Sequence, residues 1–151
     1  MPEYRLIDNR RKGGALAKEM SASLEGFHSA LLKMLADEVV GLSPVDTGTY
    51  MDNHSMHSGR KQRPRVDSSH GKPGGQDYST YADAARSRLY GDIESTKAGD
   101  EVFVSNTAVH APAVEYGGHN WKRGPYAVYR TARSRIAVLS KKAADIARGG
   151  L

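Results

Sequence analysis

Residues 15–40, ALAKEMSASLEGFHSALLKMLADEVV, decide the fold that we expect for this chain. Apolar residues recur there at steps of three and four, the spacing that places side chains along one face of an α-helix. Gly41 follows the stretch, at a position where glycine commonly ends a helix. We therefore predict a long amphipathic helix over residues 15–40 whose apolar stripe consists of Leu16, Met20, Leu24, Phe27, Leu31, Leu35 and Val39.

A second helical pattern lies near the C-terminus, over residues 125–148. Pro125 stands where the first turn of a helix accepts proline, and Gly149-Gly150 ends the pattern. Basic residues lie mostly off the apolar face. We predict a second long amphipathic helix that packs on the first, with an apolar stripe formed by Val128, Ala132, Ile136, Leu139, Ala143 and Ile146.

The stretch from residue 42 to residue 79 has a different composition. It is rich in Gly, Ser, Pro, His and basic residues, and its few larger apolar side chains after Val45 include Met51, Met56 and Val66. Such a stretch cannot bury enough apolar surface to order itself. We predict a turn followed by an extended, mobile basic loop, which by its length is more often functional than structural.

Short elements are predicted between this loop and the second long helix. In residues 80–93 the apolar side chains step by four, which indicates a short helix. Residues 101–117 are predicted to hold strands, one in the β-branched and aromatic run of residues 101–105 and a second at residues 114–116 before a glycine pair. The apolar positions of the short helix are Tyr81, Ala85, Leu89 and Ile93.

These elements together predict the fold class. A chain of 151 residues suits one domain with its own core, so we expect residues 1–151 to form a single domain. The class is α+β, with a small antiparallel sheet packed against two long amphipathic helices and a long mobile basic loop. No apolar stretch approaches the roughly 20 residues that span a bilayer, and the N-terminus lacks the apolar core of a signal peptide. We expect a chain made in the cytoplasm with no membrane contact.

Composition and motifs argue against an enzyme. The chain has no cysteine, which excludes disulfides, thiolate metal sites and a cysteine nucleophile. It has no phosphate-binding glycine motif and no serine in a nucleophile-elbow context. The histidines lack the spacing of a zinc-binding helix and are interpreted as polar surface residues, so no metal or cofactor is expected. The histidines weighed in this way are His54, His57, His70, His110 and His119.

Three segments stand in a fixed order along the chain. Residues 42–48, LSPVDTG, follow the first long helix directly. Residues 102–106, VFVSN, precede residues 111–117, APAVEYG, and a Gly-Pro pair at 124–125 opens the last helix. This pattern resembles the HK97 gp10-like family of tailed-bacteriophage neck and tail-completion proteins, in which a P-V-D-T-G turn and an N-x-x-x-Y-A-x-x-x-E-Y-G stretch after a strand recur.

The resemblance covers about residues 15–56 and 80–146. The family pattern usually has an aromatic residue before the alanine where this chain has His110, and an apolar residue where it has Tyr50. In the turn, Asp46 or Thr47 is expected to bond backbone amides and Gly48 to take a positive φ. The residues that match the family motifs are Pro44, Asp46, Thr47, Gly48, Asn106, Glu115, Tyr116 and Gly117.

The resemblance implies a non-enzymatic virion protein. Its subunits form a ring, commonly a hexamer, that acts as head-tail connector or tail terminator at the neck of the particle. The implied partners are further copies of the chain, the tail tube protein, and connector or portal-side proteins of the head. Genomic DNA passes through the lumen of such a ring and would be touched without sequence preference.

The net charge of +5 leaves a second hypothesis open, a small basic nucleic-acid-binding protein. Clustered Arg and Lys side chains bind phosphates in a salt-sensitive way that is independent of base sequence. The cluster lacks aromatic residues that would stack on bases, and a charged loop is also often simply solvated. Whether it faces DNA or a protein partner is undecided by the sequence, and the residues concerned are Arg60, Lys61, Arg63 and Arg65.

Overall fold

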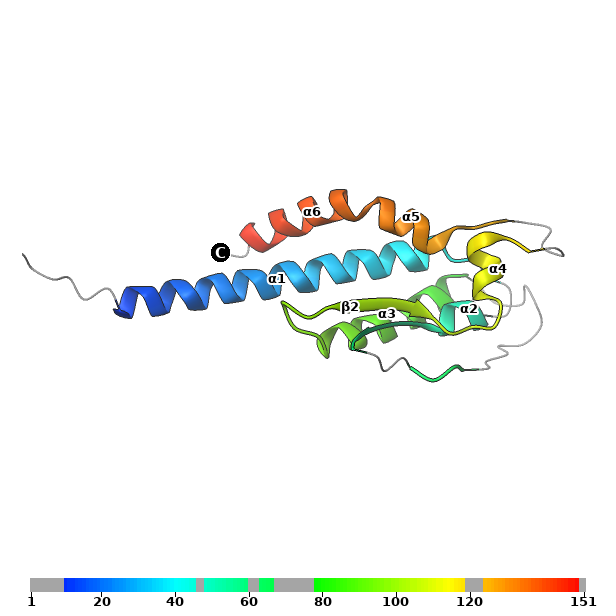
Figure 1. Ribbon diagram of the computed structural model, residues 1–151, viewed down its shortest axis with the longest axis horizontal. Helices are drawn as coiled ribbons and strands as arrows, with labels where there is room; N and C mark the ends of the chain where they lie inside the picture. The colour runs from blue at the N-terminus through cyan, green and yellow to red at the C-terminus, as the bar shows by residue number, and fades with distance from the viewer. Residues whose placement is uncertain (1–9, 46–47, 60–62, 67–77, 119–123, 150–151) are drawn as a thin grey trace, which may run out of the picture.

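The computed structural model describes residues 10–45, 48–59, 63–66, 78–118 and 124–149. Its longest element is the helix α1 (Arg10–Leu42), which runs along most of the long axis (Figure 1). At 1.5 Å per residue, a helix of 33 residues is about 50 Å long. The helix predicted for residues 15–40 is confirmed and extends beyond the predicted bounds at both ends.

The remaining elements lie on two sides of α1 (Figure 1). On one side α5 (Val128–Ser134) and α6 (Ile136–Gly149) run back along it toward its N-terminal end. On the other side lie α3 (Tyr78–Glu94) and a ribbon of two strands. The predicted packing of the two long helices is confirmed, although the second helix is divided at Arg135.

The sheet of the described residues consists of β1 (His54–Ser58) and β2 (Val102–Asn106). The strands are antiparallel, with His54 opposite Asn106 and Ser58 opposite Val102. Helix α3 packs against β1, so an apolar side of the ribbon is covered. The small antiparallel sheet of the predicted α+β class is therefore present.

Apolar side chains of α1 contribute to two core clusters. Ala36 and Val40, both fully buried, face α3 and the ribbon, where they meet Leu89 and other α3 side chains. Val39 belongs to the second cluster, which includes Val128 of α5. The C-terminal half of α1 is thus the central element of the core.

Several predictions for the middle of the chain were wrong. Residues 114–116 are not a strand but the end of α4 (Ala111–Tyr116), a short helix with proline in its first turn. Residues 49–58, predicted as turn and loop, form α2 (Thr49–Asp52) and β1. The β1 sequence is polar and gives no strand signal by itself. It forms a strand because its backbone pairs with that of β2.

The start of the C-terminal helix also differs from the prediction. Pro125 follows a cis peptide bond from Gly124 and lies before the helix, which begins at Val128 after Ala127 in a left-handed conformation. Most of the predicted basic loop, residues 60–62 and 67–77, lies outside the described residues. Among the described helices, none combines the length and apolar content needed to cross a membrane.

Candidate interaction site

The two family-like motifs meet in space at one end of the molecule. Gly48 takes a φ of 82°, as predicted, and starts α2. Asn106 at the end of β2 donates from Nδ2 to the backbone oxygen of Tyr50 at 2.8 Å, and its Oδ1 accepts from the amide of Ala108 at 2.9 Å. One side chain therefore joins the segment just after the first motif to the second motif. Half-buried Pro44 lies just after α1, while Asp46 and Thr47 are outside the described residues.

Glu115 holds the start of α5. Its side chain is buried, and its two oxygens accept from the amides of Tyr129 at 3.0 Å and Arg130 at 2.9 Å. The first amides of a helix have no partner within the helix and carry a partial positive charge, so a carboxylate satisfies both needs. The motif residue Glu115 is thus a tie between α4 and α5.

Gly117 ends α4 with a φ of 83°, a conformation that side chains other than glycine rarely adopt. Its amide donates to the oxygen of Ala113 at 2.8 Å. A Cβ at this glycine would also lie 3.8 Å from the Pro125 ring. The turn leaves the preceding residue, Tyr116, 75% exposed.

His54 is the centre of a buried polar network that sequence reasoning missed. Its Nε2 lies 2.8 Å from the Oγ of Ser43, which donates its single hydrogen to the oxygen of Val39 at 2.6 Å. Nε2 must therefore carry the proton and donate to Ser43. Nδ1 is then the acceptor for the hydroxyl of Tyr129 at 2.6 Å and for the Asn106 amide at 3.2 Å.

Burial, together with the nearby charge of Arg88, lowers the pKa of His54 to about 3. Burial also raises the pKa of Tyr129 well above its ordinary value, with the neighbouring Tyr50 adding to the shift. At neutral pH both groups are uncharged, as their hydrogen bonds require. The Ser43–His54 pair has no free acceptor nitrogen toward the serine, so it is not arranged as a nucleophile with its base.

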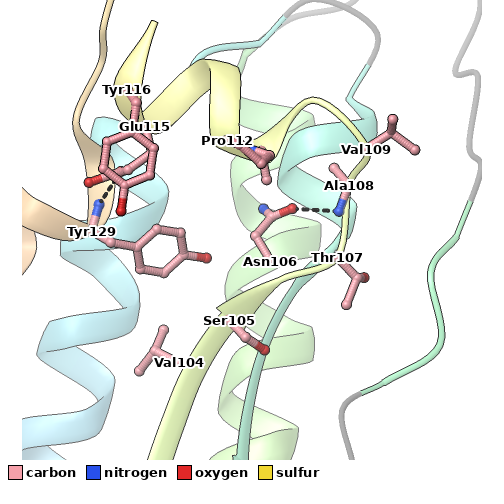
Figure 2. Close-up of a pocket in the computed structure, with 11 residues that line it drawn as sticks. Val104, Ser105, Asn106, Thr107, Ala108, Val109, Pro112, Glu115, Tyr116 and Tyr129 are labelled. Carbon is pink, nitrogen blue, oxygen red and sulfur yellow. Dashed lines mark hydrogen bonds between the residues drawn. The ribbon is translucent and has the colours of Figure 1, made fainter.

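An open hollow is lined in part by two residues of this network, Asn106 and Tyr129 (Figure 2). It has a volume of about 460 Å³ and is bordered by the end of β2, the β2–α4 connection, α4 and Tyr129. Figure 2 shows Val109 and Tyr116 on opposite sides of it, with Pro112 between them. Val109 is 72% exposed and Tyr116 is 75% exposed, which are large values for apolar and aromatic side chains. We call this feature the α4 hollow.

Two of the four basic residues of the predicted contact loop, Arg63 and Arg65, lie within the described part of the chain. Arg63 forms an ion pair with Asp92 of α3, and the second oxygen of that carboxylate accepts the Met56 amide at 3.0 Å. Arg65 is exposed, and Arg60 and Lys61 lie outside the described residues. Arg63 is thus engaged within the chain rather than extended toward solvent. Three residues after Arg63, the backbone oxygen and amide of Val66 bond the side chain of Asn53, at 2.8 and 2.9 Å.

The histidines do not converge on a metal site within the described ranges. No group of three metal-ligating side chains occurs there. His54 is in the buried network, His57 stacks on Phe103 in the ribbon, and His110 lies beside Tyr50. The interpretation of the histidines as surface residues is therefore wrong for His54, which is buried. His70 and His119 are outside the described residues.

The comparisons with known proteins identify no relative. No protein-family model matches the chain, and no curated protein or solved structure matches it.

Proposed function

We propose that the chain is a structural subunit of a tailed bacteriophage, one that assembles into a ring at the junction of head and tail. The observation that carries this proposal is the structural role of the motif residues. Asn106, Glu115 and Gly117 hold α2, β2, α4 and α5 together and present Val109 and Tyr116 to solvent. A fixed framework that exposes apolar side chains is what a subunit contact requires.

The chemistry of the described residues agrees with an assembly role. The most enzyme-like pair, Ser43 and His54, is buried and committed to structural hydrogen bonds. The carboxylate of Glu115 is likewise bound by two helix amides. In the proposed role, work is done by docking surfaces presented once per subunit, and a closed ring repeats each contact by symmetry.

Particle binding tests this function. Purified protein is mixed with phage tails, or with heads, that lack it, and the mixture is studied by native mass measurement and electron microscopy. We expect a ring seated at the tail end or at the head vertex, with joining activity restored. Protein that ignores both particles contradicts the neck assignment.

A second candidate is non-specific binding of nucleic acid. The observation that favours it is a set of exposed basic residues on α5 and α6, which adds to exposed Arg65 and consists of Arg130, Arg133, Lys141 and Lys142. Binding of a labelled DNA duplex is measured at rising salt, with Arg65→Ala and Lys141→Ala/Lys142→Ala as variants. A steep loss of affinity with salt supports this function, and negligible binding at about 0.15 M salt removes it.

A further inference from the structure

An apolar surface on α1 lies at the other end of the molecule from the α4 hollow. It consists of Leu16, Met20 and Leu24, one side chain per turn, each 58% exposed. We call it the α1 stripe. Figure 1 shows the N-terminal part of α1 projecting beyond the other elements at one end, while α4 lies at the opposite end.

Most of the α1 stripe is uncovered because α6 ends too early to reach it. A Cβ on Gly26 would lie 3.9 Å from the Cβ of Ala147, so the end of α6 is next to the middle of α1. The turns that carry Leu16 and Met20 lie beyond that point. Helices of about 12–15 residues are marginal in water without packing, so this segment gains from a partner that covers its apolar side.

The α4 hollow has the complementary shape. The α1 stripe is convex, whereas the hollow is a depression of about 460 Å³ with apolar side chains on its border. Hydrogen bonds of Asn106 and Glu115 fix the elements around the hollow, so binding there costs little conformational entropy. A pair of opposite charges is also available, because exposed Glu19 lies between Leu16 and Met20, and exposed Arg130 follows Tyr129, which borders the hollow.

The apolar area buried per copy distinguishes two ways of pairing copies. A stable interface buries about 800 Å² per partner, and the stripe alone provides well under that amount, so a copy that buries both the stripe and the hollow gains more than one that buries the stripe alone. Pairing of two stripes would use one surface per copy and leave Val109 and Tyr116 in water. A contact of stripe with hollow uses both surfaces on every copy, and the two surfaces cannot meet within one molecule because they lie at opposite ends.

We propose that the α1 stripe of one copy docks in the α4 hollow of a second copy, giving a head-to-tail contact. Such a contact is heterologous, so it continues from copy to copy until a ring closes. The proposal rests on the proposed function, in that it names the contact joining the subunits of the ring. It assigns partners to the most exposed apolar side chains at the two ends of the molecule.

Complementation between two variants tests the contact. The stripe variant carries Met20→Gln and Leu24→Gln, and the hollow variant carries Val109→Gln and Tyr116→Gln. Val138→Gln is the matched control, because Val138 is 59% exposed on α6 and belongs to neither surface. Circular dichroism and thermal melting of each protein establish that folding is retained, and native mass is measured over rising protein concentration.

We expect wild type and Val138→Gln to form the same oligomers. Each double variant alone should associate at least about tenfold more weakly, since loss of 1.4 kcal/mol is already tenfold. An equimolar mixture should form dimers of one copy of each variant that grow no further, because one intact stripe and one intact hollow remain.

Other outcomes overturn the head-to-tail contact. Oligomers of either double variant that match wild type show that the ring is joined elsewhere, while leaving the neck function intact. A hollow variant that still dimerises alone shows that two stripes pair instead. Wild type that stays monomeric at all concentrations also overturns the contact, and the neck function is then judged separately by the particle-binding experiment.

Discussion

The two halves of α1 carry the same sequence pattern but lie in different surroundings. In the C-terminal half, Ala36, Val39 and Val40 are at most 1% exposed and contact elements on both sides of the helix. In the N-terminal half, Leu16, Met20 and Leu24 remain 58% exposed. Apolar periodicity therefore establishes that a helix is amphipathic, whereas the other elements decide which of its turns are covered.

The difference matters because burial has a large energetic effect. Removing apolar area from water contributes about 25 cal/mol per Å², so the C-terminal half anchors the fold. The N-terminal half obtains little of that stabilisation within one molecule. Matched substitutions in the two halves, and in the groups attached to them, measure this contrast.

The largest effect is expected from truncating a leucine in each half. Leu32→Ala removes a side chain that is 8% exposed in the cluster facing α3, and should lower the free energy of unfolding by about 2–5 kcal/mol. Leu24→Ala, the same change at a 58% exposed site, should lower it by less than about 1 kcal/mol. Urea denaturation of the two variants measures both values. Equal losses would contradict the contrast between the halves.

Acid should destabilise the part of the core attached to the buried half. His54 donates to Ser43, just after α1, and its pKa is lowered to about 3 in the folded protein against about 6.5 when unfolded. Below pH 6.5 the unfolded chain binds a proton that the folded chain does not. Stability present above pH 6.5 is therefore lost as the pH falls toward 3, at up to roughly 1 kcal/mol per pH unit.

Unfolding free energies measured by urea between pH 7 and pH 4 test this dependence. His54→Gln is the control, because it cannot titrate. We expect that variant to be less stable at neutral pH and to have a shallower pH profile than wild type. Parallel profiles for the two proteins would show that His54 does not titrate as inferred.

A smaller effect is expected from removing one hydroxyl. Tyr129→Phe removes the donor to Nδ1 of His54 in the buried network and should cost about 1–2 kcal/mol of unfolding free energy. Tyr90→Phe is matched to it, because the Tyr90 hydroxyl donates at 2.8 Å to Asp37 at the exposed surface of α1. That variant should cost less than about 0.5 kcal/mol. Thermal and urea denaturation compare the two, and a costlier Tyr90→Phe would be inconsistent with the network.

The smallest effect is a gain in stability at the boundary between the halves. Gly26 lies in α1 at the end of α6, and an added Cβ would meet Ala147 at an ordinary contact distance of 3.9 Å. Gly26→Ala should raise the free energy of unfolding by about 0.5–1 kcal/mol. Gly14→Ala makes the same change near the helix start, with no neighbour within 4 Å. It should leave global stability unchanged, because that end opens before the core unfolds.

The sequence by itself determined the elements whose signal is local. Residues 15–40 repeat with helical spacing, and residues 101–105 have the composition of a strand, so both elements were predicted, and the strand is observed one residue later, at Val102–Asn106. The positive φ of Gly48 also follows from its place in a turn. Glu115 stands out in the sequence as a motif residue, but the amides that it binds belong to α5, which the motif does not reveal.

Tertiary structure alone decided the features that join distant segments. His54 takes its partners from residues 11, 52 and 75 positions away, so neither its burial nor its strand could be inferred from its neighbours. Residues 114–116 became helix, and Arg63 was paired with Asp92, 29 positions away. The physical reason is that periodicity reports which face of an element is apolar, whereas burial and pairing depend on which elements the folded chain brings against that face.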